Sequence, residues 1–180
     1  STSIMYAYCC NGLNAGDMNV GLTGSDGRIF TGASVDKKAE SPSHTGQVTK
    51  VNTRLLEILV RENFLPVIGS TSMDEEGMAL NINADDVGFK LAAHLRCALA
   101  VFLSDIPGIL KGKEVIRRIT PARIAEEIKA GVITGGMIPK VKSVVEALDS
   151  GVEQVSIGQY RGRGALENLI TGACGTSITN

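Results

Sequence analysis

Aromatic residues are scarce in this chain of 180 residues, which has no Trp, three Tyr and four Phe. Acidic and basic residues nearly balance, with a formal net charge of -1, and they form no basic run. A nucleic-acid surface needs clustered Lys and Arg, so the composition argues against that partner. No apolar run approaches the ~18 residues that a membrane-spanning helix needs. We therefore expect neither nucleic acid nor a membrane as a partner.

Cysteine and histidine are too few and too poorly spaced for a metal centre. The four cysteines contain no C-x-x-C pair and the two histidines belong to no zinc pattern, so we expect no metal held by side chains. The cysteines are Cys9, Cys10, Cys97 and Cys174. Adjacent cysteines are poorly placed to bridge each other, and reduced thiols are typical of the cytoplasm. We expect a cytoplasmic protein with reduced thiols.

Apolar residues and glycine are abundant, and their order predicts an α/β fold. Hydrophobic residues make up 43% of the chain, enough for a sizeable core. Strand-like and helix-like patterns alternate almost throughout, which predicts an open, mostly parallel sheet sandwiched between helices. Expected strands are 19–22, 64–68, 99–103, 154–157 and 176–178, and expected helices follow Asn52, Asn83, Thr120, Gly136 and Gly164. Residues 4–13 are expected to end a helix, 32–46 to form a surface loop, and 70–77 to form a mobile polar segment.

A glycine-rich segment that runs into a helix is the first candidate site. Gly131–Val141 contains a glycine pair, then Pro139 in the expected first helical turn and Lys140 beside it. Backbone N–H groups, the positive end of the helix dipole and an ammonium group converge at such a place, which suits a phosphate. An ordinary helix start with a solvated lysine is the alternative.

Polar residues also follow two expected strands. Asn81, Asn83 and Asp85 lie between one strand and a helix, and the turn 104–108 follows a buried strand. Open α/β sheets bind ligands at the carboxyl ends of their strands, so these residues can hydrogen-bond a substrate. In that reading Asp85 orients cationic groups such as Lys140. The alternatives are a capped helix start and, for Asp105, an Asx-type turn.

The remaining glycine-rich segments match no standard nucleotide motif. Gly108–Glu114 has a glycine spacing one residue too short for a Walker A loop, and Glu114 stands where Ser or Thr is needed. Gly162–Glu167 has Glu where a dinucleotide fingerprint needs Gly or Ala. Any nucleotide site in this chain must therefore be of another type.

Several motifs together resemble the acetylglutamate kinases of the amino-acid kinase family in order and spacing. The matching segments are Val48–Asn52, Pro66–Ile68, Asn81–Asp85, Leu103–Leu110 and Gly135–Val141. The resemblance implies the amino-acid kinase fold and ATP-dependent phosphorylation of the side-chain carboxylate of N-acetyl-L-glutamate in arginine biosynthesis. It implies ATP, with Mg²⁺ held by the phosphates, as the phosphate source.

The resemblance also implies roles for individual residues. Lys140 would stabilise the transferring phosphoryl group, Asp85 would organise the catalytic lysines, and Asn81 with Asn83 would bind the acylated amino acid. The implied nucleotide-binding residues are Ser104, Asp105, Ile106, Pro107, Gly108, Ile109, Leu110, Val132, Ile133, Thr134, Gly136 and Met137.

The same resemblance implies a homodimer or larger homo-oligomer. It assigns residues 1–80 to the remainder of the lobe for the amino-acid substrate and residues 81–180 to the nucleotide-binding lobe of one continuous sheet. The family's first strand, with a second lysine, glycine-rich loops and an arginine, has no counterpart here. We expect this chain to be a piece of a longer enzyme. One alternative is a relative that lacks the full catalytic machinery and only binds nucleotide. The other is a related kinase whose acceptor is another N-acylated or carrier-linked amino acid. The segment 158–164 departs from the family pattern linked to arginine feedback.

Overall fold

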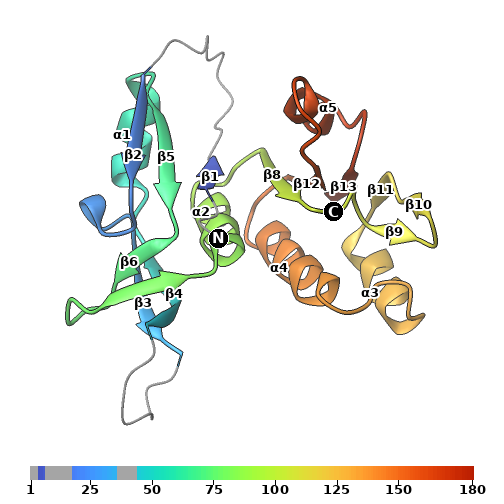
Figure 1. Ribbon diagram of the computed structural model, residues 1–180, viewed down its shortest axis with the longest axis horizontal. Helices are drawn as coiled ribbons and strands as arrows, with labels where there is room; N and C mark the ends of the chain where they lie inside the picture. The colour runs from blue at the N-terminus through green and yellow to red at the C-terminus, as the bar shows by residue number, and fades with distance from the viewer. Residues whose placement is uncertain (1–3, 7–17, 36–43) are drawn as a thin grey trace. The chain divides into compact units, whose positions relative to one another are not determined.

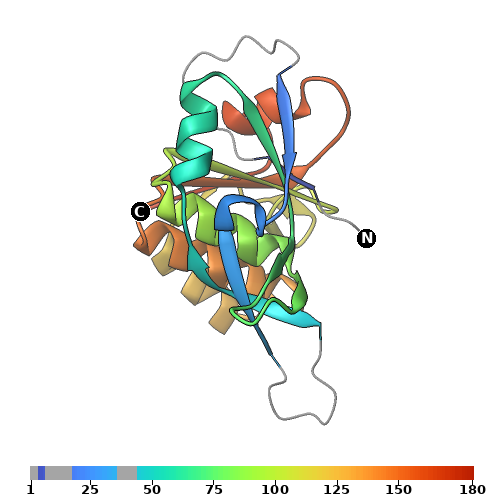
Figure 2. The ribbon, with the colours of Figure 1, turned by 90° about the vertical axis from the view of Figure 1, so that its left-hand side faces the viewer.

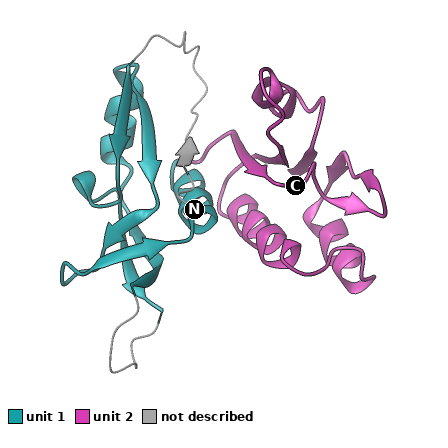
Figure 3. Ribbon diagram, in the orientation of Figure 1, with its two compact units in different colours: residues 1–95 teal, residues 96–180 magenta. Residues whose placement is uncertain are grey.

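The chain folds into two compact units, residues 1–95 and 96–180 (Figure 3). The computed structural model describes residues 4–6, 18–35 and 44–180. Each unit combines helices with mixed sheets, and the longest register, between β8 and β12, is parallel. The expected α/β class is confirmed. None of the described helices has the length and apolar character needed to cross a bilayer.

The described residues of the first unit form two sheets and two α-helices (Figures 1 and 2). One sheet has the order β1 (Ile4–Tyr6), β5 (Leu65–Gly69), β2 (Asn19–Leu22), with β2 and β5 parallel. The other has the order β3 (Phe30–Ser34), β4 (Thr45–Val51), β7 (Ala79–Ile82), β6 (Thr71–Met73). A short 3₁₀ turn covers Asp26–Arg28, and the helices are α1 (Arg54–Arg61) and α2 (Ala84–His94).

One apolar cluster joins both sheets of this unit to both helices. Each such side chain taken out of water contributes about 1.5–3 kcal/mol, so the cluster fixes where β7 ends and α2 begins. Its buried members are Ile29, Phe30, Val48, Leu56, Ile68, Leu80, Ile82, Val87 and Leu91.

The second unit is built on a four-stranded sheet in the order β11 (Arg118–Ile119), β13 (Thr176–Thr179), β12 (Gln154–Gln159), β8 (Leu99–Ser104). A small hairpin adds β9 (Leu110–Lys111) and β10 (Glu114–Val115). Helices α3 (Pro121–Lys129) and α4 (Met137–Asp149) cover one face, and α5 (Ala165–Ile170) covers the other (Figures 1 and 2). Val141 and Val144 of α4 are fully buried, as are Val155 and Ile157 of β12.

The helices expected after Asn52, Asn83, Thr120, Gly136 and Gly164 are confirmed, including most of their capping chemistry. Pro121 is the first residue of α3, and the Thr120 hydroxyl accepts a hydrogen bond from the Arg123 amide at 3.4 Å. Thr53, not Asn52, occupies the N-cap position of α1, although the Asn52 carboxamide oxygen accepts from the Arg54 amide at 3.2 Å. The expected cap is therefore shifted by one residue while Asn52 still binds a backbone donor.

Three sequence-based expectations are wrong in whole or in part. Residues 4–6 form strand β1 rather than helix; the remainder of the expected helical tail, with Cys9 and Cys10, lies outside the described residues. The expected loop 32–46 contains the end of β3 and the start of β4. The expected mobile segment 70–77 contains β6, which pairs with β7. The partner of β1 is β5, which is distant in sequence, and β3, β4 and β6 contain many small and polar residues, so the local pattern did not predict these strands.

Candidate active site

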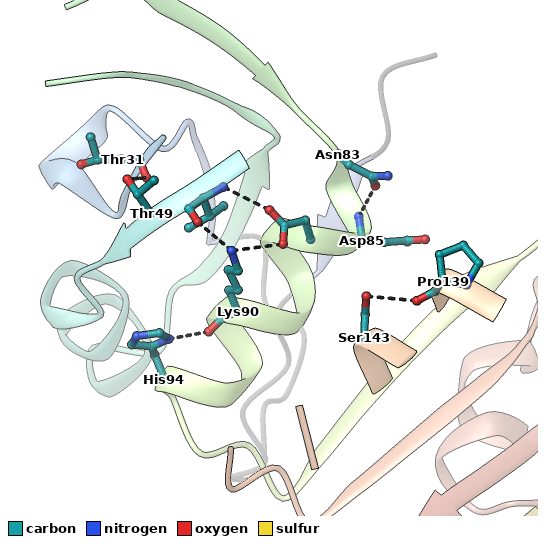
Figure 4. Close-up of polar contacts among 10 residues, drawn as sticks. Thr31, Thr49, Asn83, Asp85, Lys90, His94, Pro139 and Ser143 are labelled. Atoms are coloured by element: carbon teal, nitrogen blue, oxygen red, sulfur yellow. Dashed lines mark hydrogen bonds and ion pairs between the residues drawn. The ribbon is translucent and has the colours of Figure 1, made fainter. Parts of the chain in front are cut away.

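The corner between β7 and α2 presents polar groups of the first unit. Asn83 is the N-cap of α2, and its carboxamide oxygen accepts a hydrogen bond from the Asp85 amide at 2.9 Å (Figure 4). The capping interpretation of Asn83 is therefore confirmed. Asp85 lies in the first helical turn, half-buried, where the helix dipole stabilises a carboxylate.

Asn81 lies on the exposed face of β7 between two threonines. Its register partners are Thr45 on the parallel strand β4 and Thr71 on the antiparallel strand β6. All three residues are exposed. In the antiparallel pair, the Cβ atoms of the directly opposed residues Thr71 and Asn81 should be about 4.5–5.5 Å apart, so a ligand that reaches Asn81 should also meet Thr71. The sequence did not predict that Thr45, Asn81 and Thr71 lie side by side, because β4 and β6 were expected to be loops over part of their length.

An ion pair on α2 holds strand β4 by its main chain (Figure 4). The Val48 amide donates to the Asp86 carboxylate at 3.1 Å, and the Lys90 ammonium donates to the Val48 carbonyl at 2.6 Å. Asp86 and Lys90 are 3.4 Å apart. The β4–β7 register ends at Gly46, so the two side chains take the place of a neighbouring strand at Val48.

In the second unit, the parallel strands β8 and β12 end side by side. Ser104 and Gln159 are register partners at these carboxyl ends. The Gln159 carboxamide donates to the Asp105 carbonyl at 3.0 Å, and the Ser104 hydroxyl donates to the Asp105 carboxylate at 3.1 Å. The turn after β8 therefore has a defined course at the place where open α/β sheets bind ligands.

The end of this turn is anchored in the sheet. The Ile109 amide donates to the Thr176 hydroxyl at 2.8 Å, and the Ile109 carbonyl accepts from the Ile116 amide at 2.8 Å. The Ile109 side chain is 1% exposed. A Cβ on Gly108 would lie 2.7 Å from the Thr176 hydroxyl, so the backbone can approach there only as glycine. Ile109 thus positions the turn and leaves ligand contacts to its neighbours.

The glycine pair before α4 is exposed and open. Gly135 adopts φ 56° and Gly136 follows in helical conformation at φ -65°, an arrangement in which successive N–H groups form an anion-binding nest. No hydrogen bond of the described residues uses these two N–H groups. A Cβ on Gly136 would meet nothing within 4 Å, so neither backbone strain nor packing explains its glycine. A ligand that comes close to this backbone would explain it.

Lys140 lies one turn into α4, as expected. Met137 begins the helix, Pro139 is its third residue, and the Pro139 carbonyl accepts from the Ser143 hydroxyl at 3.2 Å (Figure 4). Lys140 is half-buried next to the fully buried Val141. Lys140 therefore lies near the same N-terminal end of α4 as the glycine nest of Gly135 and Gly136.

A charged cluster connects α3 with strand β9. The side chain of Glu127 is 4% exposed, and its carboxylate lies 3.1 Å from the Lys111 ammonium and 2.7 Å from the Arg123 guanidinium. The hydrogen bond from Lys111 is the main cause that lowers the pKa of Glu127, and the charges of Lys111 and Arg123 add to it against the opposing effect of burial. Our sequence-based reasoning missed Glu127, since nothing local distinguishes it from the exposed Glu126.

The sequence profile of the amino acid kinase family matches residues 3–159. The chain belongs to the amino acid kinase family.

Named members of the amino acid kinase family are similar to the chain over most of its length. The acetylglutamate kinase of Bacillus licheniformis is 39% identical over 143 residues, which cover 79% of this chain and 55% of that protein. The chloroplastic acetylglutamate kinase of Arabidopsis thaliana is 39% identical over 171 residues, covering 92% of this chain and 49% of that protein. The chain thus spans about half the length of these relatives.

Solved structures support the amino acid kinase fold. The crystal structure of smu.665 from Streptococcus mutans UA159 is 30% identical, with a TM-score of 0.68, and covers 84% of this chain and 57% of that chain. Giardia carbamate kinase gives a TM-score of 0.67 at 17% identity, over 93% of this chain and 64% of that chain, and shows the fold alone.

Proposed function

We propose that the protein containing this chain transfers the γ-phosphoryl group of ATP to the side-chain carboxylate of N-acetyl-L-glutamate, the step that names acetylglutamate kinases in arginine biosynthesis. The similarity to those kinases, at 39% identity over 79–92% of the chain, is the observation that carries the proposal. The exposed glycine nest beside Lys140 supplies the chemistry that such a transfer needs.

The proposed reaction needs no general base. A glutamate side chain with a pKa near ~4.3 is already ionised at neutral pH. One carboxylate oxygen forms a bond to the γ-phosphorus while the bond from that phosphorus to the bridging oxygen of ADP breaks, and no proton moves. Catalysis then consists of positioning two anions in line and offsetting their repulsion with positive charge.

We assign the phosphoryl group to the α4 end of the second unit. Lys140 would stabilise the charge of the transferring group, and the amides of Gly135 and Gly136 would donate to phosphate oxygens. The other nucleotide contacts would come from 104–110 and 132–134. Because the Ile109 and Ile133 side chains are buried, these two residues would shape the nucleotide site through the course of the backbone.

We assign the acceptor to the first unit. Asn81 would hydrogen-bond the acylated amino acid from the exposed face of β7, and Asn83 would add its amide while it caps α2. Asp85 would hold the catalytic lysines in orientation. The sequence-based boundary after residue 80 would put Asn81 and Asn83 in the nucleotide lobe, so the proposal instead takes the compact unit 1–95 as the amino-acid lobe and the unit 96–180 as the nucleotide lobe.

The proposal includes Mg²⁺ carried by the ATP phosphates, a cytoplasmic location and a homodimer or larger homo-oligomer. Among the described residues no three His, Cys, Asp or Glu side chains gather to hold a metal ion. When bound, Mg²⁺ would neutralise phosphate charge.

The complete gene product carrying these residues tests the function. With Mg-ATP and N-acetyl-L-glutamate it should form an acyl phosphate that hydroxylamine traps as a hydroxamate. L-glutamate, N-acetyl-L-aspartate and N-succinyl-L-glutamate serve as comparison acceptors. Absence of hydroxamate with every acceptor contradicts a carboxylate kinase, whereas faster turnover of another acceptor contradicts only the assigned substrate.

A further inference from the structure

Glu127 is a buried carboxylate that the proposed reaction does not use. It lies on α3, and its side chain is 4% exposed, although an ionised carboxylate is costly to remove from water. Two cations offset that cost: Lys111 on β9 and Arg123 one turn earlier on α3. The polar cluster therefore joins two elements of the second unit that are separated in sequence.

The neighbouring residue Glu126 gives a contrast within one helix. Its carboxylate also binds Arg123, at 2.7 Å, but its side chain is 64% exposed and it makes no ion pair with a residue of β9 in the described part of the chain. An exposed ion pair of this kind contributes little to stability, because water screens the two charges. Of these two glutamates, Glu127 is the one that reaches from α3 to Lys111, just after the turn that follows β8.

The main chain of Glu127 makes a second connection. Its carbonyl oxygen accepts hydrogen bonds from the Val132 amide at 2.9 Å and from the Ile133 amide at 3.1 Å. The Gly131 amide donates to the Ile128 carbonyl at 3.1 Å, and Gly131 has φ 70°. Together these bonds form a Schellman motif that ends α3 and directs the chain into 132–134.

We propose that Glu127 is a positioning residue of the nucleotide site. Its carbonyl holds the segment 132–134, and its carboxylate holds Lys111, the residue directly after the segment 104–110. The inference rests on the proposed function, which assigns both segments to ATP. The two segments belong to one unit, so one buried side chain can fix their separation.

The neutral variant Glu127→Gln should loosen this connection. The amide keeps the size and one oxygen acceptor, but it leaves Lys111 and Arg123 facing a buried neutral group. Nucleotide affinity should fall roughly tenfold, the equivalent of about 1.4 kcal/mol, while the KM of the acceptor changes by less than about twofold. A residue that acts on stability alone would not change one substrate and spare the other.

The experiment compares Glu127→Gln with the matched control Glu126→Gln in the complete protein. Binding of Mg-ADP is measured by calorimetry, and the KM values of ATP and acceptor are measured separately. Lys111→Met removes the other half of the connection, and the double variant Glu127→Gln/Lys111→Met should bind Mg-ADP about as weakly as Glu127→Gln alone. Lys111→Met also keeps the test decisive if Glu127→Gln does not fold.

Unchanged Mg-ADP affinity in both Glu127→Gln and Lys111→Met overturns the positioning role. Equal weakening by Glu126→Gln overturns it too, because the effect would then follow charge rather than the buried contact. Calorimetry needs no turnover, so a protein that binds Mg-ADP but forms no acyl phosphate refutes the proposed function and still decides the role of Glu127.

Discussion

Gly136 is a single residue at which structure and proposed chemistry can be separated. Its helical backbone and the open space where a Cβ would lie mean that Gly136→Ala should change the free energy of unfolding by less than about 1 kcal/mol. The added methyl group would nevertheless lie where phosphate is proposed to approach. We expect Mg-ATP affinity to fall at least about tenfold, measured by calorimetry.

Gly21 on β2 provides the control for this change. It also has open space around its Cβ position and no positive φ, so Gly21→Ala tests the general effect of the same substitution. Equal Mg-ATP affinity in the wild type and in Gly136→Ala would mean that phosphate does not approach this backbone.

Lys140 should affect turnover more than binding. Lys140→Met keeps most of the side-chain length and removes the charge, so a donor to the transition state is lost. We expect kcat to fall by about 10²–10³ while the KM of ATP changes less. The exposed Lys142 of the same helix is the matched control, and Lys142→Met should retain kcat within about twofold. A similar loss of kcat in Lys140→Met and Lys142→Met would mean that the total charge of α4 matters, and not a specific contact of Lys140.

Sequence reasoning proposed the polar residues of the candidate site but did not predict the environment of each. Lys140 and Asp85 follow from helix-start patterns, which are local. The burial of Ile109 and Glu127 depends on Thr176 and Lys111, which approach only when the second unit folds. Contacts between distant segments therefore account for what was missed at the residue scale.

Among the elements, α2 holds β4 through Asp86 and Lys90. Asp86→Ala would leave the buried Val48 amide without its acceptor, which costs about 1–3 kcal/mol of stability. Asp86→Asn keeps an oxygen acceptor and should lose less. Urea unfolding at neutral pH measures both, and equal losses would show that the charge, rather than the hydrogen bond to β4, matters.

On α3, the lowered pKa of Glu127 makes stability depend on pH. Because the folded-state pKa lies below the unfolded value of about 4.3, its contribution is complete above that pH and is lost as pH falls through the lower folded value. Glu127→Gln lacks this titration. The difference in urea midpoint between wild type and variant should therefore narrow as pH decreases from 7 to 3, and a constant difference would show that folding does not lower the pKa of Glu127.

Helices were easier to predict than the short strands. The helices α2 and α3 have caps in their own sequence, at Asn83 and Thr120. By contrast, β6 consists of Thr71–Met73, whose polar residues give no alternating pattern, and its pairing with β7 defines it. The prediction of the α/β class was still correct, because it depends on the order of the longer helices and strands rather than on short strands such as β6.

At the scale of the whole molecule, each compact unit has its own buried cluster and its own candidate site. Asn81 and its register partners Thr45 and Thr71 belong to residues 1–95. The glycine nest of Gly135 and Gly136 and the turn after β8 belong to residues 96–180. If the acceptor and the nucleotide bind as proposed, each ligand alone should stabilise mainly the unit that it contacts.

Hydrogen exchange of the complete protein tests the assignment of the acceptor to the first unit and of the nucleotide to the second. A non-hydrolysable ATP analogue with Mg²⁺ should slow exchange at 104–110 and at 132–137, because these amides would lose contact with water or lose opening motions. N-acetyl-L-glutamate alone should slow exchange at 79–86 and leave 132–137 near its unliganded rate. The amides of Gly135 and Gly136 are the most informative, since they make no hydrogen bond within the described chain and exchange should be fast without nucleotide. Protection of 79–86 by the nucleotide and of 132–137 by the acceptor would reverse the assignment of the two ligands.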